Sequence, residues 1–402
     1  MQKTIREGLT FDNVLLIPAY SEIVLEDVKT DTFLTKKLRL NIPIISAGGI
    51  TESQLAIAVA RQGGLGIIHN NMSIKEQAVE VDRVKRSENG VITDPFSLSP
   101  NNYVYEAEKL MARFQISGVP IIENGKLVGI ITNRDLRFET DHNKKVYEVM
   151  TRDNLITAQE GTTLAEAKVI LTQHKIEKLP LLDKKGNLKG LITIKDIQKA
   201  IKYPGAAKDS QGRLLAGASV GADYKERVNA LVDARVDVIV LDSVHGHSRS
   251  AIECVRDIKK AHPDLQVVAG NVTTKEATVA LIEAGADAIK VGMWGGDTGV
   301  GMPHITALMD CAVSARAYDV PIVSDGGFQC SGRIAKALAA GANSCMTVDI
   351  FADCDESTER TLYKGSTAEI IAQFMSNLRA AMYYCGCTNI TELQENGQFI
   401  RT

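Results

Sequence analysis

The stretch Val236-Asp237-Val238-Ile239-Val240-Leu241-Asp242 decides the expected fold. Its apolar residues follow one another with little polar alternation, which is typical of a parallel strand buried on both faces. An amphipathic pattern typical of a helix precedes it at Tyr224–Ala234. Such strand and helix patterns alternate along the chain, and the eight predicted strands are Ile42–Ser46, Gly64–His69, Ala216–Val220, Val236–Asp242, Gln266–Asn271, Ala288–Gly292, Pro321–Gly326 and Ser344–Asp349.

Eight strand–helix units predict an α/β fold of the (β/α)8 type, a TIM barrel. Further helices are predicted at Glu52–Gln62 and Lys275–Ala284, and Gly285 is a typical helix stop. An open, doubly wound sheet is the alternative, but no G-x-G-x-x-G turn follows the first strand. We therefore place the barrel at residues 1–91 and 205–402.

Residues 92–204 differ from the rest because one pattern occurs twice, at Met111–Leu136 and Leu171–Ile197. Each copy runs from a helix through a proline-containing strand and a glycine turn to the motif Ile-Thr-x-x-Asp. Internal duplication of this length indicates two copies of one supersecondary unit that complete each other's core. The predicted small domains lie at about 95–146 and 147–204.

Composition excludes several classes of protein. The net charge of −3 argues against nucleic acid as a partner, because binding to phosphate backbones needs a clustered excess of Lys and Arg. No segment has the ~18 consecutive apolar residues of a membrane span, and the polar start lacks a signal peptide's apolar core. Seven cysteines at irregular spacings suit free thiols, with no metal site expected. A cytoplasmic protein is the expectation.

Stretches such as Gly8–Pro18, Val236–His247 and Ser324–Gly327 resemble the IMP dehydrogenase/GMP reductase family. The repeated unit at Met111–Leu136 and Leu171–Ile197 resembles a pair of CBS domains, a Bateman module. This second resemblance implies that the inserted unit senses an adenine or guanine nucleotide. The first covers nearly the whole chain and implies an assembly of tetramers or octamers. The stretches that carry it are Gly8–Pro18, Gly63–His69, Val236–His247, Val268–Val272, Ser324–Gly327 and Met382–Gly386.

The family resemblance implies a ligand site at the carboxyl ends of the barrel strands. There Asp242 and Ser243 would meet the ribose of a nicotinamide cofactor, NAD(P). Asp325 would take the ribose hydroxyls of a purine nucleotide, and the backbone of Gly327 would approach its phosphate. The full set of expected barrel ligand residues is Asp242, Ser243, Asn271, Gly292, Asp325 and Gly327.

In the CBS resemblance, the Thr and Asp of each Ile-Thr-x-x-Asp motif face the ribose of the bound nucleotide. A hydroxyl and a carboxylate near a helix N-terminus can hold ribose hydroxyls, while terminal N–H groups and nearby cations hold phosphate. The alternative is that both residues only cap the following helix. The residues concerned are Thr132, Asp135, Thr193 and Asp196.

Four departures from the family pattern surround the expected barrel site. The loop Met293–Thr298 has no cysteine, although the family places its nucleophile there, and its shortness argues against the family's monovalent cation. Val348 and Asp349 replace a phosphate-binding Gly-Ser pair, and a carboxylate repels phosphate. The connection Ala352–Leu362 is too short for the family's flap, and Ser46–Glu52 is also shortened.

These losses predict a catalytically deficient relative of IMP dehydrogenase, with a regulatory or binding role in purine nucleotide metabolism. No catalytic residue is assigned, and Cys330 at a helix start is the remaining candidate nucleophile. The expected partners are purine nucleotides, further copies of the chain and a true IMP dehydrogenase. The alternative is an active NAD(P)-dependent oxidoreductase with a remodelled site, supported by Asp242, Asn271 and Asp325.

Overall fold

The computed structural model describes two compact units of the chain. The barrel unit contains residues 1–87 and 205–402, and the inserted unit contains residues 88–204. The predicted domain limits at 92 and 204 stay predictions. The residues that the structure describes are 5–88, 90–93, 95–114, 116–221, 224–292, 298–358 and 364–402.

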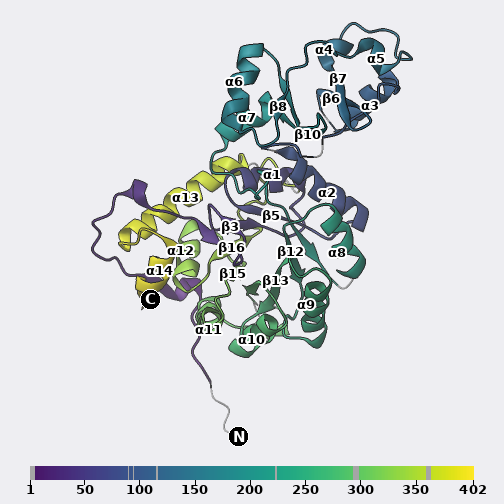
Figure 1. The fold of residues 1–402 in the computed structure, drawn as a ribbon. Helices are drawn as coiled ribbons and strands as arrows, with labels where there is room; N and C mark the ends of the chain where they lie inside the picture. The colour runs from purple at the N-terminus through teal and green to yellow at the C-terminus, as the bar shows by residue number, and fades with distance from the viewer. Residues whose placement is uncertain are drawn as a thin grey trace. The chain divides into compact units, whose positions relative to one another are not determined.

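Eight parallel strands close into a barrel in chain order, which confirms the predicted fold class and makes the open-sheet alternative wrong (Figure 1). Closure is completed by pairing of the second strand, β5, with the third, β11. The strands are β4 (Ile44–Ser46), β5 (Leu65–Ile68), β11 (Gly217–Val220), β12 (Val238–Asp242), β13 (Gln266–Val272), β14 (Ala288–Val291), β15 (Ile322–Asp325) and β16 (Ser344–Thr347).

A helix follows each barrel strand and covers the outside of the barrel. Several of these helices begin at a side-chain cap, as at Ser248, Thr274 and Ser366, whose oxygens accept a backbone N–H of the first turn. The helices are α1 (Ser53–Arg61), α2 (Ile74–Ser87), α8 (Tyr224–Asp233), α9 (Arg249–Ala261), α10 (Lys275–Glu283), α11 (His304–Arg316), α12 (Ser331–Ala339) and α13 (Thr367–Tyr384).

The predicted strands differ from the observed ones mainly at their ends. The run predicted from Val236 begins as a strand only at Val238, because the Asp237 carboxylate accepts the Ala216 N–H at 2.8 Å and the Lys85 ammonium at 2.7 Å. This side chain therefore anchors the entrance of β12 and of β11. The apolar pattern alone would start this strand at Val236, but the hydrogen-bonded Asp237 side chain sets its start at Val238.

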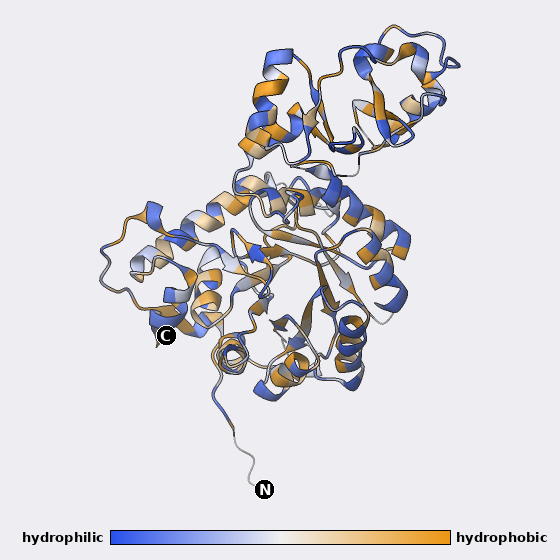
Figure 2. Ribbon diagram, viewed as in Figure 1, coloured by the Kyte–Doolittle hydropathy of each residue, from blue (hydrophilic) through white to orange (hydrophobic). Residues whose placement is uncertain are grey.

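The interior of the barrel is filled with apolar side chains, and the strands are correspondingly hydrophobic in Figure 2. This packing makes the barrel a solid core that leaves ligands only its ends. The buried residues of this cluster are Leu34, Leu40, Ile45, Ala47, Leu65, Ile67, Ala207, Leu215, Val238, Val240, Val268, Ala288, Val323 and Met346.

Shorter elements decorate the barrel unit. Two antiparallel ribbons join β1 to β17 and β2 to β3. The first ribbon pairs an early strand with the last strand of the chain, since Val14 pairs with Arg401. These elements are η1 (Phe11–Asn13), β1 (Val14–Leu16), η2 (Leu25–Asp27), β2 (Thr32–Phe33), β3 (Arg39–Leu40), α14 (Ile390–Asn396) and β17 (Phe399–Arg401).

The inserted unit consists of two similar halves, each with its own core. In the first half β6 and β7 form an antiparallel pair, and in the second β8, β9 and β10 form a sheet. Its elements are α3 (Val104–Phe114), β6 (Gly118–Glu123), β7 (Lys126–Thr132), α4 (Asn133–Leu136), α5 (Val146–Val149), β8 (Ala158–Gln159), α6 (Leu164–His174), β9 (Lys178–Leu182), β10 (Leu188–Thr193) and α7 (Ile194–Lys202).

Equivalent positions of the two halves are buried. Met111 and Val119 of the first core correspond to Leu171 and Leu179 of the second. The repeat in the sequence is therefore a repeat in structure. Within the described part of the chain, no helix has the length and apolar character needed to cross a membrane.

Candidate functional site: the barrel mouth

A cavity of about 240 Å³ lies at the carboxyl ends of the barrel strands, and we call it the barrel mouth. In barrels of this type the loops after the strands converge at this end and hold the active site. Its described lining comprises Ala47, Gly48, Gly49, Ile67, His69, Asn70, Asn71, Ser219, Val240, Asp242, Lys290, Asp325, Met346 and Val348.

A buried lysine joins two of the predicted ligand residues at the mouth. Lys290 on β14 is 3% exposed, and its Nζ lies 3.2 Å from Asp242 Oδ1 and 2.9 Å from Asp325 Oδ2. Burial alone would lower the pKa of Lys290, but the carboxylates of Asp325 and Asp242 outweigh it and raise this pKa. Lys290 therefore stays protonated and forms ion pairs with both side chains.

Asn271 and Gly292 complete this network. The Asn271 amide donates to Asp325 Oδ2 at 2.9 Å and to the Gly292 carbonyl at 2.7 Å. Position 292 requires glycine, since a Cβ there would lie 2.3 Å from the carbonyl oxygen of Asp325. The structure thus brings together four of the six predicted barrel residues, Asp242, Asn271, Gly292 and Asp325.

The other two predicted residues, Ser243 and Gly327, are not among the described lining of the mouth. The Ser243 hydroxyl accepts the His245 N–H at 3.3 Å. Gly327 has a φ of +79°, and its carbonyl accepts a hydrogen bond from Arg333 at 2.8 Å. Both residues shape loops beside the mouth.

Lys290 and His304 were not predicted as site residues from the sequence. Lys290 interrupts an otherwise apolar strand run, and that interruption was the available signal. His304 begins α11, stacks on Phe11 with ring centroids 5.1 Å apart, and has a buried Nε2 without a partner among the described residues. Burial lowers the pKa of His304, so the ring is neutral near pH 7.

No cysteine is among the described residues that line the mouth. Cys330 is exposed and occupies the cap position of α12, outside that lining. The other six cysteines are buried, and burial raises the pKa of Cys254 to about 12 and that of Cys311 to about 11. These thiols are poor nucleophiles. The predicted loop Met293–Thr298 lies outside the described residues except for Thr298.

One wall of the mouth is apolar at the end of β16. Val348 lines the cavity and packs on Gly48, where an added Cβ would lie 2.8 Å from Val348 Cγ2. The following carboxylate, Asp349, is exposed. This strand end therefore presents a side chain and a negative charge, and it lacks the open backbone that phosphate binding favours.

In the inserted unit the four predicted residues form caps. The Thr132 hydroxyl and N–H both donate to Asp135 Oδ2 at 2.7 Å at the start of α4. The Thr193 hydroxyl accepts the Asp196 N–H at the start of α7. Both motifs therefore cap the helices that follow them, as the capping alternative predicts. Nucleotide binding at these residues stays a prediction.

A buried lysine lies beside one of these caps. Lys178 is 8% exposed, and a Cβ built on Gly118 would lie 2.8 Å from its Cε and 3.0 Å from Thr132 Cγ2. Among the described residues, only the Glu177 carboxylate pairs with Lys178, at 3.9 Å. Burial has the largest influence and lowers the pKa of Lys178. The Glu177 and Asp135 carboxylates raise this pKa, the nearby cations Lys195 and Arg134 lower it, and the net change is downward.

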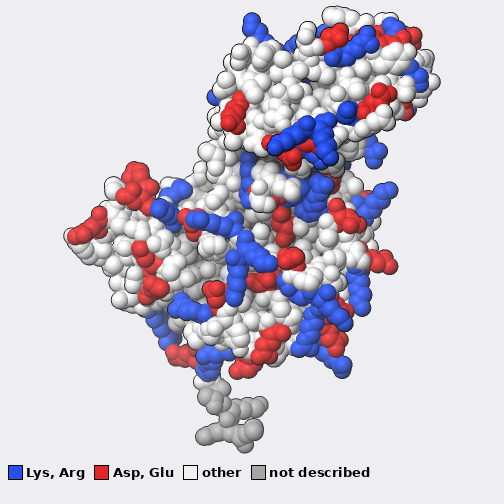
Figure 3. Space-filling view, in the orientation of Figure 1, with Lys and Arg blue, Asp and Glu red and all other residues white. Residues whose placement is uncertain are grey.

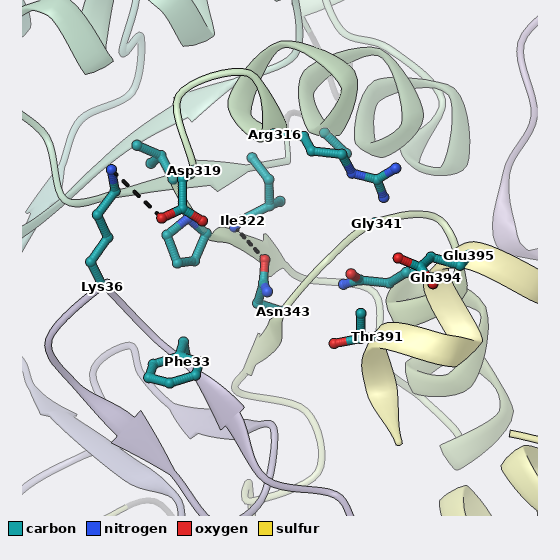
Figure 4. A pocket seen from close by; sticks show the side chains of 13 residues that line it. Phe33, Lys36, Arg316, Asp319, Ile322, Gly341, Asn343, Thr391, Gln394 and Glu395 are labelled. Carbon is teal, nitrogen blue, oxygen red and sulfur yellow. Dashed lines mark hydrogen bonds and ion pairs between the residues drawn. The ribbon is translucent and has the colours of Figure 1, made fainter. Parts of the chain in front are cut away.

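A larger cavity of about 420 Å³ lies at the opposite end of the barrel (Figure 4). It is bordered by the start of β15, where the Ile322 N–H donates a hydrogen bond of 2.9 Å to Asn343 Oδ1. Lys36 and Asp319 form an exposed ion pair of 3.9 Å at its edge. Because this is the end that supports stability in such barrels, we do not place the site there.

Charged side chains of both signs are interspersed on the face of the molecule shown in Figure 3. The fold and the mouth together define a (β/α)8 barrel protein with a cavity at the carboxyl ends of its strands. A sequence model of the IMP dehydrogenase / GMP reductase domain matches residues 8–363 and 358–402. The chain belongs to this family.

Individual relatives agree with this membership. The chain is 51% identical to the inosine-5'-monophosphate dehydrogenase of Halalkalibacterium halodurans and 50% identical to that of Bacillus subtilis, covering 98% of this chain and 93% of each relative. Among solved structures it resembles a GMP reductase of Trypanosoma brucei in complex with guanosine 5'-triphosphate. That match has a TM-score of 0.89 and 34% identity, covering 99% of this chain and 98% of the other.

A second Trypanosoma brucei GMP reductase structure, in complex with guanosine 5'-monophosphate, has a TM-score of 0.90 and 31% identity. It covers 99% of this chain and 96% of the other. The alignment with the Halalkalibacterium halodurans protein spans 453 positions, whereas this chain has 402 residues, so at least 51 positions have no residue here. The two matched pieces of the family model meet at residues 358–363, within or directly after the connection predicted to lack a flap.

Proposed function

We propose that this chain is a catalytically silent member of its family that binds purine nucleotides and acts as a regulatory protein in purine nucleotide metabolism. The observation that carries the proposal is the missing nucleophile. No cysteine occurs in Met293–Thr298, and none is among the described lining of the mouth. Covalent catalysis on a purine ring needs an activated nucleophile within reach of the ring.

Cys330 is a poor substitute for the missing thiol. It lies at the start of α12 and outside the described lining, whereas a nucleophile must contact the reacting atom. The absent flap, supported by the two-piece family match, removes a further part of the machinery. Silence thus follows from several separate changes around one cavity.

The inserted unit supplies the proposed nucleotide site, as a CBS pair. The caps Thr132–Asp135 and Thr193–Asp196 place hydroxyls and carboxylates at two helix starts. Lys178 adds a buried ammonium group whose carboxylate partner among the described residues, Glu177, lies 3.9 Å away. A phosphate group beside Lys178 would compensate its charge, which favours a nucleotide over a nucleoside in this unit.

The second candidate is an active oxidoreductase of the IMP dehydrogenase or GMP reductase type. The specific observation in its favour is the ordered Asn271–Asp325–Lys290 network. A nicotinamide cofactor would supply hydride transfer when bound. The Asp242 side chain is 60% exposed and uses only Oδ1 toward Lys290, so its other oxygen fits a ribose hydroxyl, with Ser243 beside it.

The test is an assay of nicotinamide absorbance with IMP and NAD, and with GMP and NADPH, using an active relative as positive control. We expect no turnover above the blank, together with calorimetric binding of ATP or GTP to the full chain. Turnover that Asp325→Ala abolishes would overturn silence and favour the second candidate. Cys330→Ser serves as the check for a substitute nucleophile.

The proposed partners are further copies of this chain, as tetramers or octamers, and an active IMP dehydrogenase subunit. The relatives' length and the nearly complete coverage support a shared mode of assembly. Light scattering of the purified chain, alone and mixed with an active relative, measures both. A monomer that forms no mixed species would remove this part of the proposal.

A further inference from the structure

The charges at the barrel mouth indicate what kind of ligand it can hold. Among its described lining residues the acidic and basic side chains are Asp242, Lys290 and Asp325. Two carboxylates thus face one ammonium group. Lys290 already lies between both carboxylates, so it cannot also neutralise an anionic ligand. The ring of His69, which also lines the mouth, lies 3.7 Å from the Glu52 carboxylate.

The wall at the end of β16 adds to this exclusion of anions. Val348 fills the space above Gly48 with methyl groups, and Asp349 places another carboxylate directly after it. A phosphate group there would meet a negative charge and an apolar surface. Lys364 lies beside this strand end, but its ammonium group already contacts the Asp349 carbonyl oxygen at 3.2 Å and the Asp353 carboxylate at 3.8 Å, and it is not among the described lining residues. The mouth therefore disfavours a phosphorylated ligand.

The same carboxylates are well placed to accept hydroxyl groups. Oδ2 of Asp325 accepts hydrogen bonds from Lys290 and Asn271. None of the hydrogen bonds between described residues involves Oδ1 of Asp325. The ion pair with Lys290 at 2.9 Å fixes the Asp325 side chain, so its Oδ1 is an acceptor for a neutral donor. Two adjacent hydroxyls of a ring sugar can meet Asp325 and the exposed oxygen of Asp242.

The rest of the lining suits a flat or apolar ring. Ala47, Ile67, Val240, Met346 and Val348 form an apolar surface beside the acceptors. The volume of about 240 Å³ lies below the usual range for drug-sized ligands, roughly 300 to 1,000 Å³. A small ligand with a polar edge and an apolar body fits both features.

We propose that the barrel mouth binds a neutral ligand with a vicinal diol, of the nucleoside class, in preference to the corresponding nucleotide. This differs from the Trypanosoma brucei GMP reductase structure, which holds guanosine 5'-monophosphate. The inference does not rest on catalytic silence, because a bound nucleoside could be inert or could react. Turnover and binding are therefore measured separately.

The experiment is calorimetric titration of the full chain with guanosine, inosine, GMP, IMP and 2′-deoxyguanosine. We expect guanosine or inosine to bind at least about tenfold more tightly at the mouth than its monophosphate. Removal of one diol hydroxyl in 2′-deoxyguanosine should weaken binding by at least about tenfold, because a carboxylate loses its donor. This comparison needs no variant and so is independent of folding.

Variants then locate the binding in the barrel. Asp325→Asn should abolish the heat of nucleoside binding at the mouth and leave any heat of nucleotide binding in the inserted unit unchanged. Val348→Gly with Asp349→Ser should improve GMP binding relative to guanosine, whereas Asp264→Ser, an exposed carboxylate far from the mouth, should not. Equal or tighter binding of GMP that Asp325→Asn removes would overturn the inference, as would the absence of nucleoside binding.

Discussion

Two buried lysines, one in each unit, differ in what surrounds them. Lys290 in the barrel unit is 3% exposed and lies within 3.2 Å of two carboxylates. Lys178 in the inserted unit is 8% exposed, and its nearest carboxylate among the described residues is 3.9 Å away. The pKa of Lys290 is raised and that of Lys178 is lowered. Burial is similar, so the partners decide the direction.

This difference indicates which of the two units can stabilise an anionic ligand. At the barrel mouth the Asp242 and Asp325 carboxylates already compensate the charge of Lys290. An added phosphate would therefore compete with Asp325 for the Lys290 ammonium group. The inserted unit leaves Lys178 largely uncompensated, and Arg134 and Lys195 add positive charge near it. An anionic ligand would therefore be stabilised in the inserted unit and disfavoured at the mouth.

The largest expected effect comes from breaking the compensated site. Lys290→Met leaves Asp325 and Asp242 facing each other without a cation. Removal of one partner of a buried ion pair costs several kcal/mol, and since Asp242 is largely exposed we expect about 3 kcal/mol of lost unfolding free energy. Urea unfolding of the variant and the parent protein measures this difference.

Lys36→Met is the matched control for that measurement. Lys36 forms an exposed ion pair with Asp319 at the other end of the barrel (Figure 4), and such pairs contribute about 0 to 1 kcal/mol. If Lys290→Met cost no more than Lys36→Met, the mouth would not depend on its internal ion pairs, and the comparison of the two lysines would fail.

An intermediate effect of opposite sign is expected in the inserted unit. Lys178→Met removes a buried cation that has no carboxylate nearer than 3.9 Å among the described residues, so stability should be unchanged or rise by about 1 kcal/mol. Affinity for ATP or GTP should fall about tenfold, because the phosphate loses its cation. Unfolding and calorimetry on the same samples measure both quantities.

Lys189→Met, at an exposed position of β10, is the control for Lys178→Met. It should change neither stability nor nucleotide affinity appreciably. A Lys178→Met variant that is strongly destabilised and binds nucleotide normally would show that Lys178 supports the fold of the inserted unit. The proposed phosphate contact would then be wrong.

The sequence predicted the barrel because strand patterns are local. All eight predicted runs overlap an observed strand, and their order gives the closed sheet. Asp242, Asn271 and Asp325 were predicted from the family resemblance, and each lies at the end of a predicted run or one residue before it. The ends of the strands were less predictable, since Asp237 bonds to Lys85, a residue distant in the sequence.

The contacts of the two buried lysines could not be predicted either, because they join residues that are distant in the sequence. Lys290 meets Asp242 and Asp325 only after three separate strands assemble, and no local pattern records that meeting. Lys178 lies beside Gly118, its counterpart in the other repeat, because glycine leaves room for the lysine side chain. Aligning the two repeats would have revealed this Gly–Lys exchange, although not its consequence for charge.

The smallest expected effect is a difference in pH dependence. Because the folded-state pKa of Lys178 is lowered, the unfolded chain binds a proton that the folded chain does not, between that lowered pKa and the ordinary value of about 10.4. Lys178 therefore makes stability rise with pH in this window. Lys290 has a raised pKa, so its contribution is fully present there and is lost only above about pH 10.4.

Urea midpoints measured at several pH values between about 8 and about 10 separate the two lysines. The difference between Lys178→Met and the parent protein should shrink or change sign as the pH rises, whereas the deficit of Lys290→Met should stay constant. A constant difference for Lys178→Met would mean that this lysine is protonated throughout the window. Its charge would then be compensated within the folded protein, and the two buried lysines would not differ in kind.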